Sequence, residues 1–202
     1  MTTTGTGSIG VQAIAGGRAD LVDTTIATSG NGAHGIHAND NGSIVNATRV
    51  DVSTSGFSAH GVYADRGSTV NLTDTHVSTS GAYSSGVLAS SGSTVSIQNS
   101  LIETSGAYVY GAISAVNNSD VTINQSDIRS NGDYSIGLYA SSGSSMNISN
   151  STVLTTGANS LGMDIRNSDV HLQNTHVRTE GANSVGALSL IHISEPTRRR
   201  GI

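Results

Sequence analysis

The sequence has no cysteine, lysine or tryptophan, and it has only one phenylalanine and one proline. Without cysteine, the chain has neither a disulfide framework nor a thiolate metal site. Aromatic residues make up 3% of the chain, so a conventional core of large side chains is not expected. Charged residues make up 11%, whereas disordered chains are usually highly charged and poor in β-branched residues. Val, Ile and Thr are abundant here, and this composition favours strands.

Long apolar runs are also missing, so no segment predicts a membrane-spanning helix. The opening residues, MTTTGTGSIG, have neither the basic end nor the apolar stretch of a signal peptide. The net charge is −5. Residues 188–202 hold three of the nine Arg and one of the 14 acids, which leaves 6 Arg and 13 acids in residues 1–187, a charge of −7. This balance disfavours binding of nucleic acid through a basic face.

Glycine recurs at two fixed positions of an internal repeat. The first series has spacings of 25, 26, 25, 25, 26, 25 and 24 residues and consists of Gly10, Gly35, Gly61, Gly86, Gly111, Gly137, Gly162 and Gly186. The second series lies five residues earlier and consists of Gly30, Gly56, Gly81, Gly106, Gly132, Gly157 and Gly181. A repeat of this length predicts a solenoid, in which each unit buries its apolar face against its neighbours.

Within each repeat, apolar and polar residues alternate as in strands with one buried face. One such position is occupied in successive repeats by Val70, Val95, Val121, Met146 and Val170. Three short segments of this kind, together with their turns, account for the length of one repeat. We therefore predict an all-β parallel β-helix with three short strands per rung and about seven to eight rungs, in which those five residues stack in one buried column.

Two finer expectations concern the corners of the coil. Hydroxyl side chains occupy one inward position, where we expect hydrogen bonds from rung to rung; they are Thr28, Thr54, Thr79, Thr104, Ser130, Thr155 and Thr179. The count from each first-series glycine to the next serine of the repeat varies from 6 to 8 residues, while the rest of the repeat is constant. We therefore expect only that corner to accept insertions.

The repeats resemble the passenger domains of bacterial autotransporters of the pertactin/AIDA-like kind. The resemblance covers about residues 5–187 and rests on a strand-and-turn of the form Ser/Thr-x-Val-x-Ile/Leu-x-Asn-Ser/Thr, at Ser93 to Ser100, Ser144 to Ser151 and Ser168 to Thr175, with a closing Thr-Ser-Gly. It implies a right-handed β-helix on the bacterial cell surface or outside the cell, exported by type V secretion and anchored through a C-terminal membrane β-barrel. It also implies an adhesive, virulence-associated role.

The repeat pattern stops near the C-terminus. Residues 1–187 form the expected β-helix fragment, whereas Leu188 to Arg198 reads LSLIHISEPTR, which resembles the translated read-through of a transposon-based sequencing adapter. We expect residues 188–202 to be an artefactual tail that does not continue the coil. Because the repeats begin and end between ordinary rungs, we also expect purified residues 1–187 to be β-rich and to self-associate end to end.

Three tyrosines form the candidate binding site. Tyr83, Tyr108 and Tyr134 lie at one position of consecutive repeats, two residues after the second-series glycine. Such a column is either an exposed contact surface for a host or bacterial glycan or protein, or a ladder that stiffens the rod. His34 and His60 also share a column, but no third ligand repeats with them, so no metal site and no cofactor are expected.

Catalysis is not expected in this chain. A β-helix hydrolase needs two carboxylates about 5–9.5 Å apart, and a lyase needs clustered acids for Ca²⁺ with a base. The acids here are scattered, and no lysine can act as a base. The leading hypothesis is a structural and adhesive surface rod without catalytic residues; the alternative is a carbohydrate-active β-helix, such as a polysaccharide lyase, a hydrolase or a phage tailspike.

Overall fold

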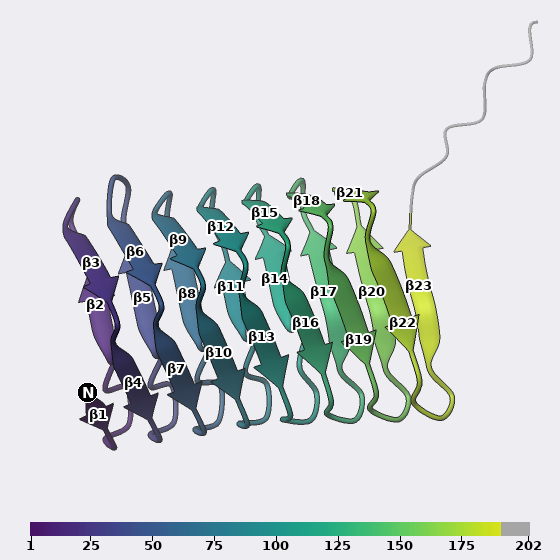
Figure 1. Cartoon of the computed structure of the whole chain (residues 1–202), viewed down its shortest axis with the longest axis horizontal. Helices are drawn as coiled ribbons and strands as arrows, with labels where there is room; N and C mark the ends of the chain where they lie inside the picture. The colour runs from purple at the N-terminus through teal and green to yellow at the C-terminus, as the bar shows by residue number, and fades with distance from the viewer. Residues whose placement is uncertain (191–202) are drawn as a thin grey trace, which may run out of the picture.

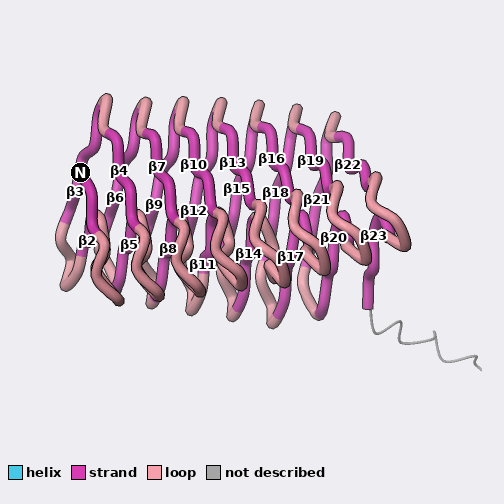
Figure 2. The backbone as a smooth tube through the Cα atoms, turned by 90° about the horizontal axis from the view of Figure 1, so that it is seen from below, coloured by secondary structure: helices cyan, strands magenta, loops and turns pink. Residues whose placement is uncertain are grey.

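A computed structural model describes residues 1–190, with side-chain exposure defined to residue 188. Within this range all regular structure is β-strand, arranged as a coil in which the chain passes through three parallel sheets in turn. Figure 1 shows the successive rungs stacked along the long axis, and Figure 2 shows the turns that join their strands. No described segment forms a helix of the length and hydropathy needed to cross a bilayer.

The three sheets contain 8, 8 and 7 strands. The first sheet comprises β1 (Thr2–Thr3), β4 (Thr25–Thr28), β7 (Asp51–Thr54), β10 (His76–Thr79), β13 (Leu101–Thr104), β16 (Asp127–Ser130), β19 (Thr152–Thr155) and β22 (His176–Thr179). The second comprises β2 (Val11–Ala13), β5 (Ile36–Asn39), β8 (Val62–Asp65), β11 (Val87–Ala89), β14 (Ile113–Val116), β17 (Ile136–Ser141), β20 (Leu161–Arg166) and β23 (Val185–Leu190). The third comprises β3 (Arg18–Val22), β6 (Ile44–Thr48), β9 (Thr69–Thr73), β12 (Thr94–Gln98), β15 (Asp120–Asn124), β18 (Ser145–Ser149) and β21 (Asp169–Gln173).

The predicted core column is present. Val70 pairs with Val95, Val95 with Val121, Val121 with Met146 and Met146 with Val170 across the third sheet. The first four are fully buried, and Val170, in the last rung with a third-sheet strand, is half-buried against the core. The period-two alternation of the sequence thus places one face of each strand inside the coil, and the predicted parallel β-helix is confirmed.

The hydroxyl column lies inside the coil as expected, but most of its hydrogen bonds are made within one rung and not between rungs. Thr28, Thr54 and Thr79 donate to the backbone carbonyl five residues later in the same rung, at 2.6, 2.8 and 3.1 Å. Thr104 donates to Ser130 of the next rung at 3.4 Å. The expectation of rung-to-rung bonding is therefore wrong for those three threonines. Their hydroxyls satisfy carbonyls at the corner that follows, which the parallel ladder leaves unpaired.

The position of the insertions is a second correction. Ile113 pairs with Val87 on one side and Leu138 on the other, so the residue aligned with Gly86 and Gly137 is Ala112. Gly111, assigned to the first glycine series, therefore lies one residue before its expected position. The rung of β14 has its extra residue in the corner before the strand, so two corners of the coil accept insertions.

The predicted boundary at residue 187 falls within β23. That strand pairs in register with β20 as far as Leu190, opposite Arg166. Residues 191–202, to which most of the adapter-like tail belongs, lie outside the described residues.

Candidate binding face

The three predicted tyrosines form one stack at the corner between the first and second sheets. Ring centroids are 5.6 Å apart for Tyr83 and Tyr108, with planes 13° from parallel, and 5.2 Å apart for Tyr108 and Tyr134, with planes 9° from parallel. The backbone sets this register, because each tyrosine N–H donates to a carbonyl of the next rung. Phe57 packs against the outer face of Tyr83 at 5.3 Å, tilted by 57°. All four rings are exposed at the surface.

The backbone at these tyrosines is left-handed. Tyr83, Tyr108 and Tyr134 have φ angles of 58°, 58° and 55°, a region that costs most side chains roughly 1–2 kcal/mol and that asparagine tolerates best. Asn159 holds the same turn position two residues after the glycine of its rung, with φ 54°. Three consecutive tyrosines therefore occupy a position where asparagine is the conformationally favoured residue. Left-handed residues recur at the turns along the whole coil, and Ser58 holds this same position with φ 53°, so it is the aromatic side chains and not the backbone that distinguish these three rungs.

The extra residue of the β14 rung adds a second aromatic group to this face. Tyr110, at the insertion, is 63% exposed, and it lies 6.5 Å from Tyr83 and 6.3 Å from Tyr139 of β17 between ring centroids. Small residues follow it in the chain: Gly111 and Ser114 are both buried. A Cβ added at Gly111 would lie 2.5 Å from the backbone oxygen of Ile113, so a larger residue would not fit here.

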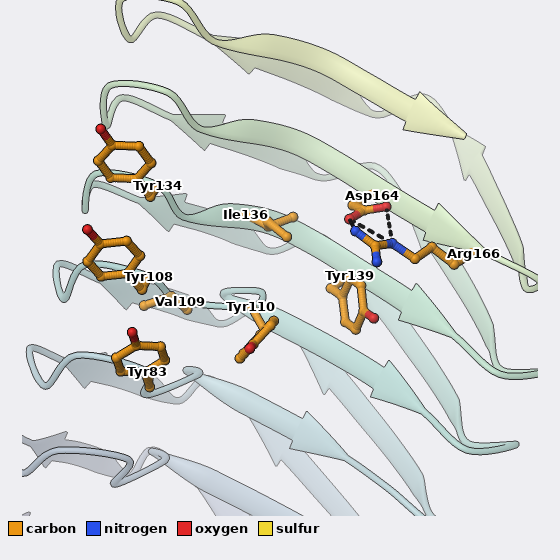
Figure 3. A pocket seen from close by; sticks show the side chains of 9 residues that line it. All are labelled: Tyr83, Tyr108, Val109, Tyr110, Tyr134, Ile136, Tyr139, Asp164 and Arg166. Atoms are coloured by element: carbon orange, nitrogen blue, oxygen red, sulfur yellow. Dashed lines mark hydrogen bonds and ion pairs between the residues drawn. The ribbon is translucent and has the colours of Figure 1, made fainter. Parts of the chain in front are cut away.

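Two adjoining hollows, of about 300 and 400 Å³, lie on the outer face of the second sheet and share Tyr83, Tyr110 and Tyr139. In Figure 3 the ladder of Tyr83, Tyr108 and Tyr134 stands along one side of the first hollow, while Tyr110 and Tyr139 lie opposite. The second hollow extends toward Phe57 and is also lined by Leu88 and Val116. Together they form an aromatic and aliphatic groove, which we call the tyrosine groove, running across the strands along the axis of the coil.

An ion pair closes one end of the tyrosine groove. Asp164 of β20 is fully buried and accepts hydrogen bonds from Arg166 at 3.0, 3.1 and 2.7 Å. These contacts raise the pKa of Arg166. The guanidinium also lies 5.8 Å from the centroid of the Tyr139 ring. Because Asp164 occupies both of its oxygens with Arg166, the pair is a fixed polar boundary (Figure 3).

Histidines cluster toward the other end. His34 and His60 stack at 5.1 Å, and His37 stacks on Tyr63 at 4.8 Å. The backbone N–H of His60 donates to Nδ1 of His34, and the N–H of Ser85 donates to Nδ1 of His60, both at 3.0 Å. Each ring is therefore neutral, with its proton on Nε2. Burial lowers the pKa of His34 to about 4 and that of His60 to about 3, with the neighbouring histidines adding to the shift.

The ring nitrogens of His34 and His60 are already engaged. The Nδ1 atoms of His34 and His60 are used by backbone N–H groups, and protons occupy the Nε2 atoms. Across residues 1–190, no three His, Cys, Asp or Glu side chains lie where they could share a metal ion. The tyrosine groove itself has one carboxylate, Asp164, among its lining residues. The arrangement suits contact with a partner more than acid–base chemistry.

Sequence reasoning placed the three tyrosines together correctly, but it missed the rest of the tyrosine groove. Tyr110 and Tyr139 belong to it, as do Phe57 and the Asp164–Arg166 pair. One signal was available: from the Ala-Tyr of the turn to the alanine of the following strand, the chain reads AYVYGAISA in this rung and AYSSGVLA in the rung before, which is one residue more. Aligning the segments on Gly111 hid that insertion.

The chain matches the family model described as "Right handed beta helix region" over residues 34–189. No curated protein matches the sequence. Among solved structures, a chain of "The cryo-EM structure of the Vag8-C1 inhibitor complex" is similar, with a TM-score of 0.78 and 21% identity over 93% of this chain and 52% of that chain. The present chain thus spans about half the length of that neighbour, and at this identity the likeness shows a shared fold. The expected handedness is confirmed, and the resemblance to autotransporter passengers is confirmed at the level of the fold. The chain belongs to the family of right-handed β-helix proteins.

Proposed function

We propose that this chain is part of a surface-exposed β-helical passenger of a bacterial autotransporter, which binds a partner molecule through the tyrosine groove and carries out no catalysis. The observation that carries the proposal is the column of Tyr83, Tyr108 and Tyr134. Three exposed aromatic rings stand on left-handed backbone, where asparagine would be more stable. Large rigid side chains with a polar tip are the residues that binding surfaces use most.

The solved neighbour supports a protein as the partner. That structure is of Vag8 in a complex with C1 inhibitor. A protein that shares this fold is thus found in a complex with another protein, and the tyrosine groove offers such a partner a surface on this chain. The same likeness supports a location at the cell surface or outside the cell.

The chemistry of the tyrosine groove supports binding rather than hydrolysis. Glycoside hydrolases use two carboxyl groups on opposite sides of the bond. Asp164 is the carboxylate that lines the groove, and Arg166 holds both of its oxygens. With both oxygens already accepting hydrogen bonds from the guanidinium, this carboxylate is poorly placed to act on a substrate.

A cell-binding assay tests this function. The fluorescently labelled whole chain is compared with a variant in which Tyr83, Tyr108 and Tyr134 are all replaced by asparagine, and with Thr122→Asn on the exposed face of the third sheet as the matched control. We expect the triple variant to lose binding to host or bacterial cells by about tenfold or more and the control to bind normally. Equal binding by all three proteins would contradict the proposed site.

Location and catalysis have separate tests. Antibody against the rod should label intact bacteria that express the full-length protein, and external protease should remove the label. Incubation with acidic and neutral polysaccharides should release neither reducing ends nor unsaturated sugars. Release that disappears in an Asp164→Asn variant would replace this proposal with a carbohydrate-active enzyme.

A further inference from the structure

We propose that the tyrosine groove is a docking site for a cationic amphipathic α-helix of a partner protein. This inference rests on the proposed binding function and specifies the partner. Four observations carry it: the orientation of the aromatic rings, their spacing along the axis, the complete pairing of the strands beneath them, and the charge around the groove.

The ladder presents ring edges to a ligand. Tyr108 has both faces covered, by Tyr83 at 5.6 Å and by Tyr134 at 5.2 Å, and Phe57 packs against the outer side of Tyr83. Figure 3 shows the three hydroxyls directed the same way, at the outer edge of the stack. Sugars and bases bind aromatic side chains by stacking on ring faces. A ladder whose faces are occupied by its own members offers them little, whereas aliphatic side chains pack well between ring edges.

The repeat of the rings is close to that of a helix. The rings recur once per rung, roughly 4.8 Å apart along the axis, and the pitch of an α-helix is about 5.4 Å. A helix lying along the groove would therefore place about one apolar residue per turn against the edge of each successive ring, with a drift of roughly half an ångström per turn. An extended strand repeats its side chains on one face every roughly 6.7 Å and would lose register with the ladder.

Backbone hydrogen bonding also favours a helix. The tyrosine groove lies over the face of the second sheet, where β8, β11, β14 and β17 are each paired on both sides. No strand edge is free there to accept a peptide by strand addition. A helix satisfies its backbone groups internally and needs only an apolar groove, which Leu88, Val116 and Tyr110 help to line.

The negative charge of this protein determines which residues the partner helix should carry on its solvent side. Residues 1–190 contain 13 acids and 6 Arg, a charge of −7, and no lysine. The acidic Asp133 is exposed next to Tyr134 at the rim, while Asp164 and Arg166 neutralise each other at the end of the groove. A partner helix with lysine and arginine on its solvent side is therefore attracted to this surface, and an acidic helix is repelled.

A designed peptide provides the test. The probe is a fluorescein-labelled peptide of about 18 residues with leucine at i, i+3, i+4 and i+7 and lysine at most other positions; it is long enough to span the ladder. Its control has the same composition in an order without an apolar stripe. Because the described part of the protein contains no helix, helical circular dichroism gained on mixing with the whole chain reports the bound peptide. Cellohexaose serves as the glycan probe.

We expect the striped peptide to bind and become helical. Its Kd should rise about tenfold or more in a Tyr108→Asn, Tyr110→Ala double variant and stay unchanged in Thr122→Asn. The inference is overturned if the scrambled peptide binds equally well, if no helicity is gained, or if the double variant binds as tightly as the wild type. Tyrosine-dependent binding of cellohexaose in place of the peptide would also overturn it, while leaving the binding function intact. Equal cell binding by the wild type and the triple asparagine variant would instead contradict the proposed binding function itself.

Discussion

Tyr108 and Tyr134 stack with ring centroids 5.2 Å apart, although both residues hold left-handed backbone with φ angles of 58° and 55°. The stack recovers part of the conformational cost, because an aromatic pair contributes about 0.5–1.5 kcal/mol beyond its buried area. The ladder is thus close to neutral for stability. A ladder that adds little stability is expected of a contact surface, whereas a stiffening ladder should stabilise the fold.

Replacing Tyr108 by asparagine should change the free energy of unfolding by no more than about 1 kcal/mol. The variant loses two stacking contacts, but it gains the residue that tolerates φ near 58° best. Denaturant titration followed by circular dichroism gives the value, with Thr122→Asn as the surface control. A loss above about 2 kcal/mol would identify the ladder as a structural element instead of a binding surface.

The stability of the fold should fall as the pH drops from about 6.5 toward 3. His34 and His60 have folded pKa values of about 4 and 3, below the usual 6.5, because burial disfavours their charged form. Between those pH values the unfolded chain binds protons that the folded chain does not, so unfolding becomes easier. Above about pH 6.5 the contribution is complete and constant.

Measurement between pH 7 and pH 5 isolates this effect from the carboxylates. In that window the denaturation midpoint of the wild type should fall, and His60→Ser should show a shallower slope. Serine is a suitable replacement, since Ser85 follows His34 and His60 at the corresponding position of the next rung. Identical slopes for both proteins would show that His60 does not remain neutral by burial.

Gly137→Ala should destabilise the coil by about 1–3 kcal/mol. A Cβ at this position would lie 2.6 Å from the carbonyl oxygen of Gly162 and 2.9 Å from Val153, so the rungs would have to separate. Gly186 belongs to the same glycine series, but within residues 1–190 a Cβ there would meet nothing closer than 3.9 Å, so Gly186→Ala should cost less than about 0.5 kcal/mol. Comparable losses in the two variants would mean that backbone entropy, and not the close approach of rungs, requires glycine in this series.

The purified polypeptide of residues 1–190 should self-associate through its end rungs. In that polypeptide β3 and β21 are the edge strands of the third sheet, and their columns match from rung to rung. Unpaired strand edges are templates for another chain. Analytical ultracentrifugation over a concentration series measures the effect, and a polypeptide with a polar capping segment added at each end is the control. A monomer at all concentrations without caps would be inconsistent with this expectation.

The sequence alone determined the coil and its core. Alternation with period two decides which side of each strand is buried, and a repeat near 25 residues decides which residues stack, so Val95 had to lie between Val70 and Val121. The column of Tyr83, Tyr108 and Tyr134 followed from the same two periods. Each of these inferences needs only the distance along the chain.

Only the tertiary structure decided which corner took the extra residue. The repeats can be aligned on either Gly111 or Ala112 with almost equal agreement of the sequence pattern. The parallel ladder has only one register, in which the N–H of Val87 donates to the carbonyl of Ala112. That register places Tyr110 and Ser114 together in the lining of the tyrosine groove. Likewise, the contact of Arg166 with Tyr139 and the corner bonds of Thr54 depend on side-chain direction at a turn. Periodicity fixes which residues are neighbours, but where those side chains point is fixed only once the rungs are packed against one another.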